Sequence, residues 1–155
     1  MSGNQGKASF GAIQQKIHQD MQARGWSWIW VFDPGRENSP FVYSIGFYTS
    51  FNHPEVVVAG LPQDVSENVL SSVHVALTEG VVYSAGDTSD RILEGVGVQF
   101  RAIPQDLLLS ALAQASAFYA GEAFSALQLV WPDKDGNFPG EGAPAWLNDR
   151  QAILP

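Results

Sequence analysis

The first clear pattern in the chain is helical and covers residues 9–24. Apolar side chains recur there at intervals of three and four positions, at Phe10, Ile13, Ile17 and Met21. Polar residues fill the positions between them, so the segment is predicted to form an amphipathic helix that buries one face. Gly25 follows directly, and its conformational freedom suits the left-handed end of such a helix.

After Gly25 the apolar positions alternate with polar or smaller ones, which is typical of strands. The first two strand-like segments are rich in aromatic residues, and the third is a short β-branched run after the Asn52-His53-Pro54 turn. The predicted strands cover residues 26–32, 41–48, 55–59, 96–103 and 127–131.

Two further helices are predicted between these strands. Asp64 and Glu67 have the spacing of a capping box, and the apolar residues that follow keep helical intervals until Gly80. Pro104 suits the first turn of the third helix, which is predicted to end at Gly121.

The order of these elements predicts the fold class. Residues 86–95 are polar and bounded by glycines, and no helix or strand is predicted there; the residues after Asp133 are expected to form an ordered but irregular tail. At least two strands follow each other without a helix between them, so a regular β-α-β alternation is missing. We therefore expect one α+β domain over residues 9–155, with a mainly antiparallel sheet and about three helices packed on it. Residues 1–8 are expected to be a flexible N-terminus.

The composition agrees with a single folded domain. The chain has 155 residues and a mass of 16.8 kDa, and 45% of its residues are hydrophobic against 15% charged. Two domains would each have only about 80 residues. A chain of this mass buries about two-thirds of its surface on folding, so its core can be stable without disulfides, and it contains no Cys.

The charge and the absent residue types exclude several classes of protein. Sixteen acidic and eight basic residues give a net charge of −8, which repels a phosphate backbone and favours a basic protein partner. We therefore expect no nucleic-acid binding. No apolar run approaches the roughly 20 residues of a membrane span, and the first residues do not resemble a secretory signal. Together with the absence of Cys, these features predict a cytoplasmic protein without a membrane segment.

The densest group of reactive side chains lies between the second and third predicted strands. Tyr43, Ser44, His53 and Glu55 fall within thirteen residues and could supply a nucleophile, a base and an orienting carboxylate. Ser44 lacks the Gly-x-Ser-x-Gly turn that exposes a nucleophile. An imidazole in a turn before proline often binds backbone groups, so a structural role for His53 is favoured over ligand contact or catalysis. Glu55 could equally anchor a loop, and no catalytic residue is assigned.

Metal binding has little support in the sequence. The segment Asp133-Lys134-Asp135-Gly136 resembles the beginning of a calcium loop, but Pro144 stands where such a loop needs its final acidic ligand. His18, His53 and His74 lie in separate predicted elements without ligand spacing. We expect no metal site, and we expect residues 133–136 to form a tight turn.

Three segments together resemble a bacterial family of short stand-alone proteins. They are Phe41-Val42-Tyr43-Ser44-Ile45-Gly46-Phe47 with His53-Pro54-Glu55 and Gly60-Leu61; Phe118-Tyr119; and Leu127-Gln128-Leu129-Val130-Trp131-Pro132-Asp133 with Gly136, Phe138-Pro139 and Gln151. In this order they are similar to the domain of unknown function family 4262, over roughly residues 10–154. The combination is specific, whereas each segment alone would be a weak signal.

This resemblance implies no established activity, and the cofactor therefore stays unknown. By position it marks seven candidates for binding a ligand or a partner: Tyr43, Ser44, His53, Glu55, Gln128, Trp131 and Asp133. Gln128 is polar within an apolar strand, which is typical of functional sites, although simple alternation could also turn it toward solvent. Gly140 stands where the family has Trp after a Phe-Pro pair, which implies an altered site if that Trp closes one.

Three kinds of function are compatible with these observations. The favoured one is a non-catalytic binding protein with a protein partner, in the manner of an antitoxin or an immunity protein. The alternative is a small-molecule-binding protein or an enzyme with a pocket around Tyr43, His53, Glu55 and Trp131, loosely analogous to flavin-binding split barrels. The third is a structural subunit, for instance a homodimer joined at an edge strand.

Overall fold

The protein, described here by a computed structural model, is built on one sheet of six strands in the order β1-β2-β3-β6-β5-β4. The structure describes residues 10–32 and 40–152, so the expected flexible segment 1–8 lies outside the described residues. The strands are β1 (Ser27–Val31), β2 (Phe41–Ile45), β3 (Glu55–Ala59), β4 (Thr88–Leu93), β5 (Val96–Ala102) and β6 (Ala126–Val130). All neighbouring pairs are antiparallel except β3 and β6, which are parallel.

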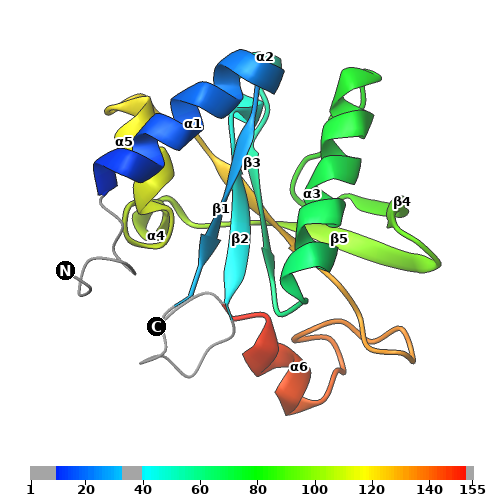
Figure 1. Cartoon of the computed structure of the whole chain (residues 1–155). Coiled ribbons are helices and arrows are strands. Elements are labelled where there is room, and N and C mark those ends of the chain that lie inside the picture. The colour runs from blue at the N-terminus through cyan, green and yellow to red at the C-terminus, as the bar shows by residue number, and fades with distance from the viewer. Residues whose placement is uncertain (1–9, 33–39, 153–155) are drawn as a thin grey trace.

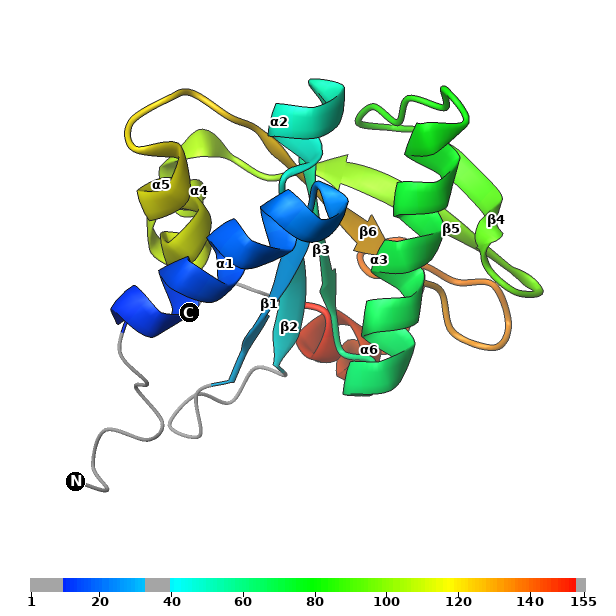
Figure 2. The same ribbon diagram turned by 45° about the horizontal axis from the view of Figure 1, so that its top comes forward.

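Helices cover both faces of this sheet (Figures 1 and 2). The helices are α1 (Phe10–Arg24), α2 (Phe47–Phe51), α3 (Gln63–Thr78), α4 (Gln105–Ala111), α5 (Ala113–Tyr119) and α6 (Ala145–Arg150). Helices α1, α4 and α5 lie on one face and α3 lies on the other, while α2 and α6 lie at opposite ends of the central strands. This arrangement confirms an α+β domain with a mainly antiparallel sheet.

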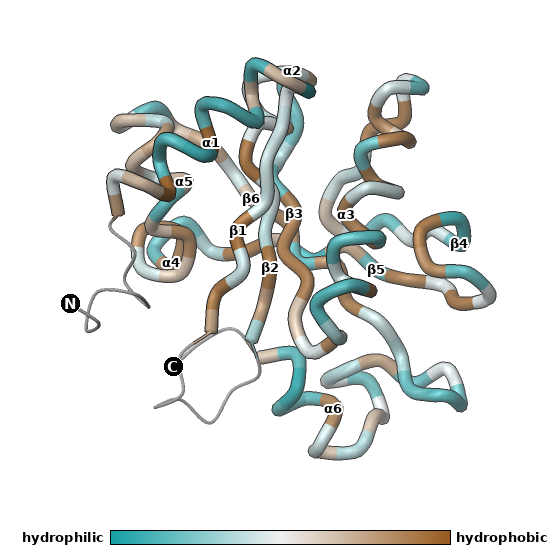
Figure 3. The backbone as a smooth tube through the Cα atoms, in the orientation of Figure 1, coloured by the Kyte–Doolittle hydropathy of each residue, from teal (hydrophilic) through white to brown (hydrophobic). Residues whose placement is uncertain are grey.

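The two covered faces explain why the central strand β3 is apolar at every position after Glu55. Val56, Val57 and Val58 are all buried, and β3 is correspondingly brown in Figure 3. Val56 and Val58 pack toward α3, whereas Val57 packs with α1, α4 and α5. A strand that is buried on both faces has no polar side to alternate with.

Two expectations fail around the second strand and the third helix. The strand expected over residues 41–48 ends at Ile45, because Gly46 adopts a φ of 115° and α2 begins at once. The helix expected from Pro104 to Gly121 is two helices, since Leu112 leaves the helical conformation with φ −116° and ψ 57°.

Two segments for which no helix or strand was predicted contain regular structure. Within residues 86–95, β4 pairs with β5 at the edge of the sheet, and its polar sequence reflects that exposed position. After Asp133 the chain forms α6, which begins directly after Pro144. The helices are therefore more numerous than expected, but the fold class is unchanged. No helix in residues 10–32 or 40–152 combines the length and apolarity needed to cross a membrane.

Candidate functional site

A fully buried carboxylate organises the end of the sheet that carries α2. Glu55, the first residue of β3, is 0% exposed and receives hydrogen bonds at both carboxylate oxygens. The Ser44 hydroxyl donates to Oε1 over 2.6 Å, and the Tyr119 hydroxyl donates to Oε2. The backbone N–H groups of Gly46, Phe47 and Tyr48 also donate to it, over 3.1, 3.2 and 3.0 Å. We call Ser44, Gly46, Glu55 and Tyr119 the Glu55 network.

The local sequence explains why the carboxylate lies there. Gly46 ends β2 in a left-handed conformation, and the first N–H groups of α2, like those of any helix, have no partner within the helix. Glu55 provides the missing acceptor, and a negative charge at the positive end of a helix is favourable. The Tyr119 hydroxyl also accepts the Gly46 N–H over 2.9 Å. The network therefore ties β2, α2, β3 and α5 together.

Burial and hydrogen bonding act in opposite directions on the acidity of Glu55. Burial raises the pKa of the Glu55 carboxyl above its ordinary value, whereas the bonds from Ser44, Tyr119 and the backbone lower it. Burial and the adjacent Glu55 charge both raise the pKa of the Tyr119 hydroxyl. Tyr119 therefore stays protonated and serves as a hydrogen-bond donor.

His53 lies beside this network but does not belong to it. Its ring is buried, and Nε2 accepts the backbone N–H of Tyr83 over 2.9 Å. Nδ1 therefore carries the proton and donates it to the carbonyl of Pro54 over 2.8 Å. Burial lowers the pKa of His53 below its usual value of 6.5. A neutral ring with both nitrogens bound to the backbone holds the turn between α2 and β3.

These bonds do not form a nucleophile–base pair. The Ser44 hydroxyl donates directly to Glu55, and its oxygen also accepts the backbone N–H of Val56 over 2.9 Å. No imidazole is positioned to take its proton, since both nitrogens of His53 bind backbone atoms elsewhere. Tyr43 lies in the core beneath α4 and α5, where its hydroxyl accepts the backbone N–H of Gln114 over 3.1 Å.

The remaining candidates lie at the opposite end of the sheet. In the parallel pair β3–β6, Glu55 is level with Ala126 and Val58 with Leu129, so Trp131 follows at the far end. Its indole N–H donates to the carbonyl of Ala59 over 2.9 Å. The structure therefore does not bring Trp131 into one pocket with Tyr43, His53 and Glu55.

At this far end another buried polar residue, Gln151, holds α6 against the sheet. The Gln151 side chain accepts the Trp131 N–H over 3.0 Å and donates to the Trp131 carbonyl over 2.6 Å. The half-buried Gln128 donates to the Gln151 carbonyl over 2.6 Å. Gln151 is 3% exposed and was not among the sequence candidates, although it belongs to the third segment of the family resemblance.

Asp133 forms the expected turn. Its Oδ1 accepts the backbone N–H groups of Asp135 and Asn137 over 2.9 and 2.8 Å, and these bonds lower the pKa of Asp133. No group of three or more His, Cys, Asp or Glu side chains could hold a metal ion within residues 10–32 and 40–152.

A shallow hollow lies on the surface beside the Glu55 network. It has a volume of about 470 Å³ and lies between α2 and α5. Its lining comprises Tyr48, Thr49, Asn52, Phe118, Tyr119 and Glu122. We call it the α2–α5 hollow. The sequence candidates did not include Tyr48 or Asn52, because Tyr48 was expected at the end of a strand and Asn52 in the following turn, with no helix between them.

Comparison with known proteins identifies the family but no activity. No match was found among curated proteins or among solved structures. The profile of one protein family, described as Domain of unknown function (DUF4262), matches residues 20–143, which include all six strands and helices α2 to α5. The chain belongs to this domain of unknown function family.

Proposed function

We propose that this protein is a non-catalytic binding protein whose partner is a protein with a basic surface, in the manner of an antitoxin or an immunity protein. The observation that carries the proposal is the uneven distribution of charge. Residues 61–100 contain six acidic residues and one basic residue, and so hold −5 of the net charge of −8. The acidic residues are Asp64, Glu67, Glu79, Asp87, Asp90 and Glu94, and the basic residue is Arg91.

This segment forms one side of the molecule. It contains α3, which covers one face of the sheet, and β4, which is the edge strand next to α3. A concentration of one charge on one side speeds encounter with an oppositely charged protein and disfavours other partners. The proposal retains the cytoplasmic location expected from the sequence, so the partner would be found in the same compartment.

The hydrogen bonding of the buried polar residues supports binding over catalysis. Ser44, His53 and Glu55 are the residue types of a hydrolytic site, but each is engaged by backbone or network partners. Such saturated groups hold the scaffold rather than react with a substrate. Their arrangement leaves recognition to the surface.

The test begins with the natural host. The immobilised protein is exposed to a lysate of that host, and each retained protein is identified, produced separately and mixed with the chain. We expect one basic protein to form a stoichiometric complex in light scattering, with an association rate that falls steeply as salt is added. If no purified candidate forms a complex, or if salt leaves the association rate unchanged, the proposal is wrong.

A matched pair of variants makes this test specific. A triple variant in which Gln replaces Glu67 and Glu94 and Asn replaces Asp90 should associate with the partner about tenfold or more slowly at low salt. Neutralising Asp106, Glu122 and Asp149, which lie outside the acidic segment, changes the net charge equally and should slow it much less. Equal effects of the two triple variants would show that only total charge matters.

A second candidate function rests on the α2–α5 hollow. Its aromatic and amide lining beside the buried Glu55 network could hold a small polar ligand. Native mass spectrometry of protein isolated from its host tests this alternative, because a stoichiometric bound small molecule would favour it. A bound flavin would also be visible as a yellow colour.

A further inference from the structure

A groove runs between α3 and β4, which both belong to the acidic segment 61–100. Its volume is about 390 Å³, and we call it the α3–β4 groove. It is lined by Asn68, Ser71, Ser72, Val75 and Arg91. This volume is at the lower end of the roughly 300–1,000 Å³ of ligand sites, so the groove suits side chains of a docked segment better than a cofactor.

The outer stripe of α3 gives the groove its character. Asn68, Ser72 and Val75 recur at intervals of four and three, so they share one face of the helix. Val75 is 48% exposed although it is apolar, and the other groove residues from α3 are short and uncharged. The stripe therefore offers one apolar contact and several hydrogen-bonding groups, and α3 carries no Lys or Arg that would repel a cation.

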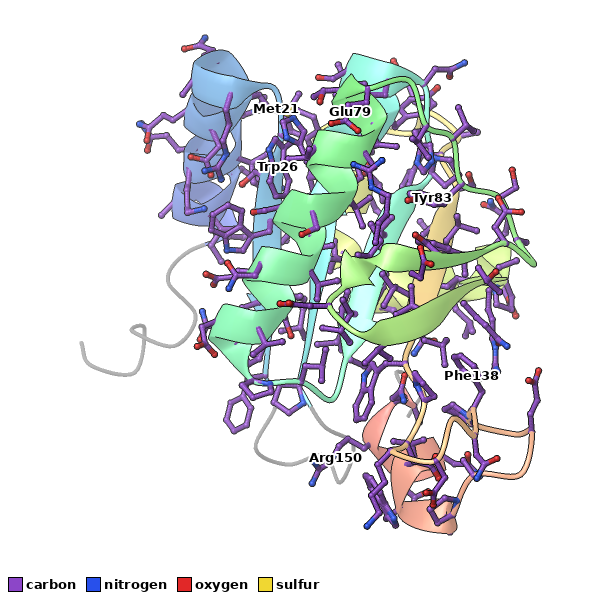
Figure 4. All side chains as sticks on the ribbon, turned by 90° about the vertical axis from the view of Figure 1, so that its right-hand side faces the viewer. Met21, Trp26, Glu79, Tyr83, Phe138 and Arg150 are labelled. Atoms are coloured by element: carbon purple, nitrogen blue, oxygen red, sulfur yellow. The ribbon has the colours of Figure 1, made fainter. Side chains whose placement is uncertain are left out.

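Arg91, which lines the groove, forms an exposed ion pair with Glu79. The Arg91 guanidinium lies 2.7 Å from the Glu79 carboxylate, and both side chains are about half exposed. Glu79 is the residue that follows α3, and Figure 4 shows it at that end of the helix. Because exposed pairs contribute little net stability, Arg91 can leave Glu79 at small cost when another cation replaces it.

From these observations we propose that the α3–β4 groove docks a basic segment of the partner protein, in which an apolar side chain contacts Val75 and an adjacent Arg or Lys pairs with Glu79 in place of Arg91. This inference rests on the proposed function, because it names the surface that the basic partner would use. Charge complementarity favours a basic partner segment over a second copy of this chain, because the same face of a second copy would bring a like-charged surface to the groove.

The first test uses a defined probe. An acetylated and amidated peptide of alternating arginine and valine is titrated into the ¹⁵N-labelled full chain, and amide resonances are followed by NMR. We expect saturable shifts at Asn68, Ser72, Val75, Glu79 and Arg91, and none with the peptide that has glutamate in place of arginine. Absence of shifts at these residues, or shifts confined to another surface, overturns the inference.

Two variants separate docking in the groove from general attraction. Ser71→Arg fills the groove with a cationic side chain at an exposed helical position, so it should leave folding intact and weaken peptide binding at least tenfold. Ser110→Arg adds the same charge on α4, on the opposite face of the sheet, and should weaken binding less than twofold. Equal weakening by both variants overturns the inference.

The same variants distinguish this inference from the proposed function. If a purified host protein binds the wild-type chain, Ser71→Arg should abolish the complex and Ser110→Arg should preserve it. If Ser71→Arg binds that protein as well as wild type does, the groove is the wrong surface although the proposed function stands. If no host protein binds the wild-type chain, the proposed function itself fails.

Discussion

At the scale of single residues, Glu55 decides how the α2 end of the sheet is held. Five donors point at its two carboxylate oxygens, and three of them are backbone N–H groups whose direction is fixed. A hydroxyl can rotate so that its oxygen accepts a hydrogen bond, whereas a backbone N–H can only donate one. Both terminal side-chain atoms at position 55 must therefore be hydrogen-bond acceptors, and only a carboxylate provides two acceptor oxygens there.

The substitution Glu55→Gln tests this requirement. If the new NH₂ group takes the place of Oε1 it faces the N–H of Phe47, and in the other orientation it faces those of Gly46 and Tyr48. We expect a loss of about 2–3 kcal/mol in the free energy of unfolding, seen as a fall of about 5–10 °C in Tm. The exposed Glu122→Gln should change stability by less than about 0.5 kcal/mol. A Glu55→Gln protein as stable as wild type would contradict a structural role for the network.

The neutral state of His53 predicts a dependence of stability on pH. Its pKa is lowered by burial in the folded protein, so between the folded pKa and the ordinary value of 6.5 only the unfolded state binds a proton. The contribution of neutral His53 to the free energy of unfolding is therefore full above pH 6.5 and decreases as the pH falls below it. We expect a loss of up to about 1.4 kcal/mol between about pH 7.5 and about pH 5.5, measured by urea unfolding at both pH values.

A variant that cannot titrate isolates this contribution. Gln at position 53 offers an oxygen near the place of Nε2, so His53→Gln can keep the acceptor for the Tyr83 N–H but gains no proton. It should be less stable than wild type at high pH and lose less stability on acidification. His74, whose pKa is also lowered by burial, is present in both proteins and cancels in the comparison. An identical loss in both proteins would show that His53 does not contribute.

At the scale of elements, Gly46 is the junction that turns β2 into α2. Its φ of 115° is rarely adopted by other residues, and a Cβ there would lie 2.6 Å from the Met21 sulfur and 2.7 Å from the Trp26 Cα. Figure 4 shows both residues where α1 leads into β1. The backbone of β1 cannot withdraw without disturbing its pairing with β2. Gly46 is therefore required by its conformation and by the close approach of the chain.

The pair Gly46→Ala and Gly80→Ala separates these two requirements. Gly80 has a similar φ of 90°, but a Cβ there would have nothing within 4 Å. We expect Gly80→Ala to cost about 1–2 kcal/mol for the left-handed conformation alone. Gly46→Ala adds the cost of overpacking and should destabilise the protein by about 3–4 kcal/mol in total. Equal losses in urea unfolding would mean that the close approach contributes nothing.

The same junction shows what the sequence can and cannot predict. The long periodic segments at α1 and α3 and the β-branched run of β3 were predicted correctly from their apolar pattern, although in α1 only Ile17 is buried and Phe10 is 49% exposed. The pattern of β2 continues through Phe47 in sequence, but the fold interrupts it at Gly46 with a carboxylate from nine residues later. Such a long-range cap is not visible in local periodicity. For the same reason the partners of Gln128 and His53 could not be derived before the structure.

At the scale of the whole molecule, the total charge is readable from the sequence but its placement is not. Asp64 and Asp90 are far apart in the chain, yet they lie on α3 and β4, which contact each other. The fold thereby gathers most of the excess acid on one side of the sheet. The edge strand on that side also carries a register irregularity between Ser89 and Leu93. Charges and bulges on an edge both oppose pairing with another sheet.

These features predict that the free protein is a monomer rather than an edge-paired dimer. We expect light scattering at low salt to give a mass close to 16.8 kDa at every accessible concentration. A mass near twice that value, stable to dilution, would contradict the prediction and favour a structural subunit. In that case Thr88→Pro, at a position that the alternation of β4–β5 bonds leaves with its N–H facing away from β5, should dissociate the dimer if β4 forms the contact. A dimer that survives this substitution would locate the contact elsewhere on the protein.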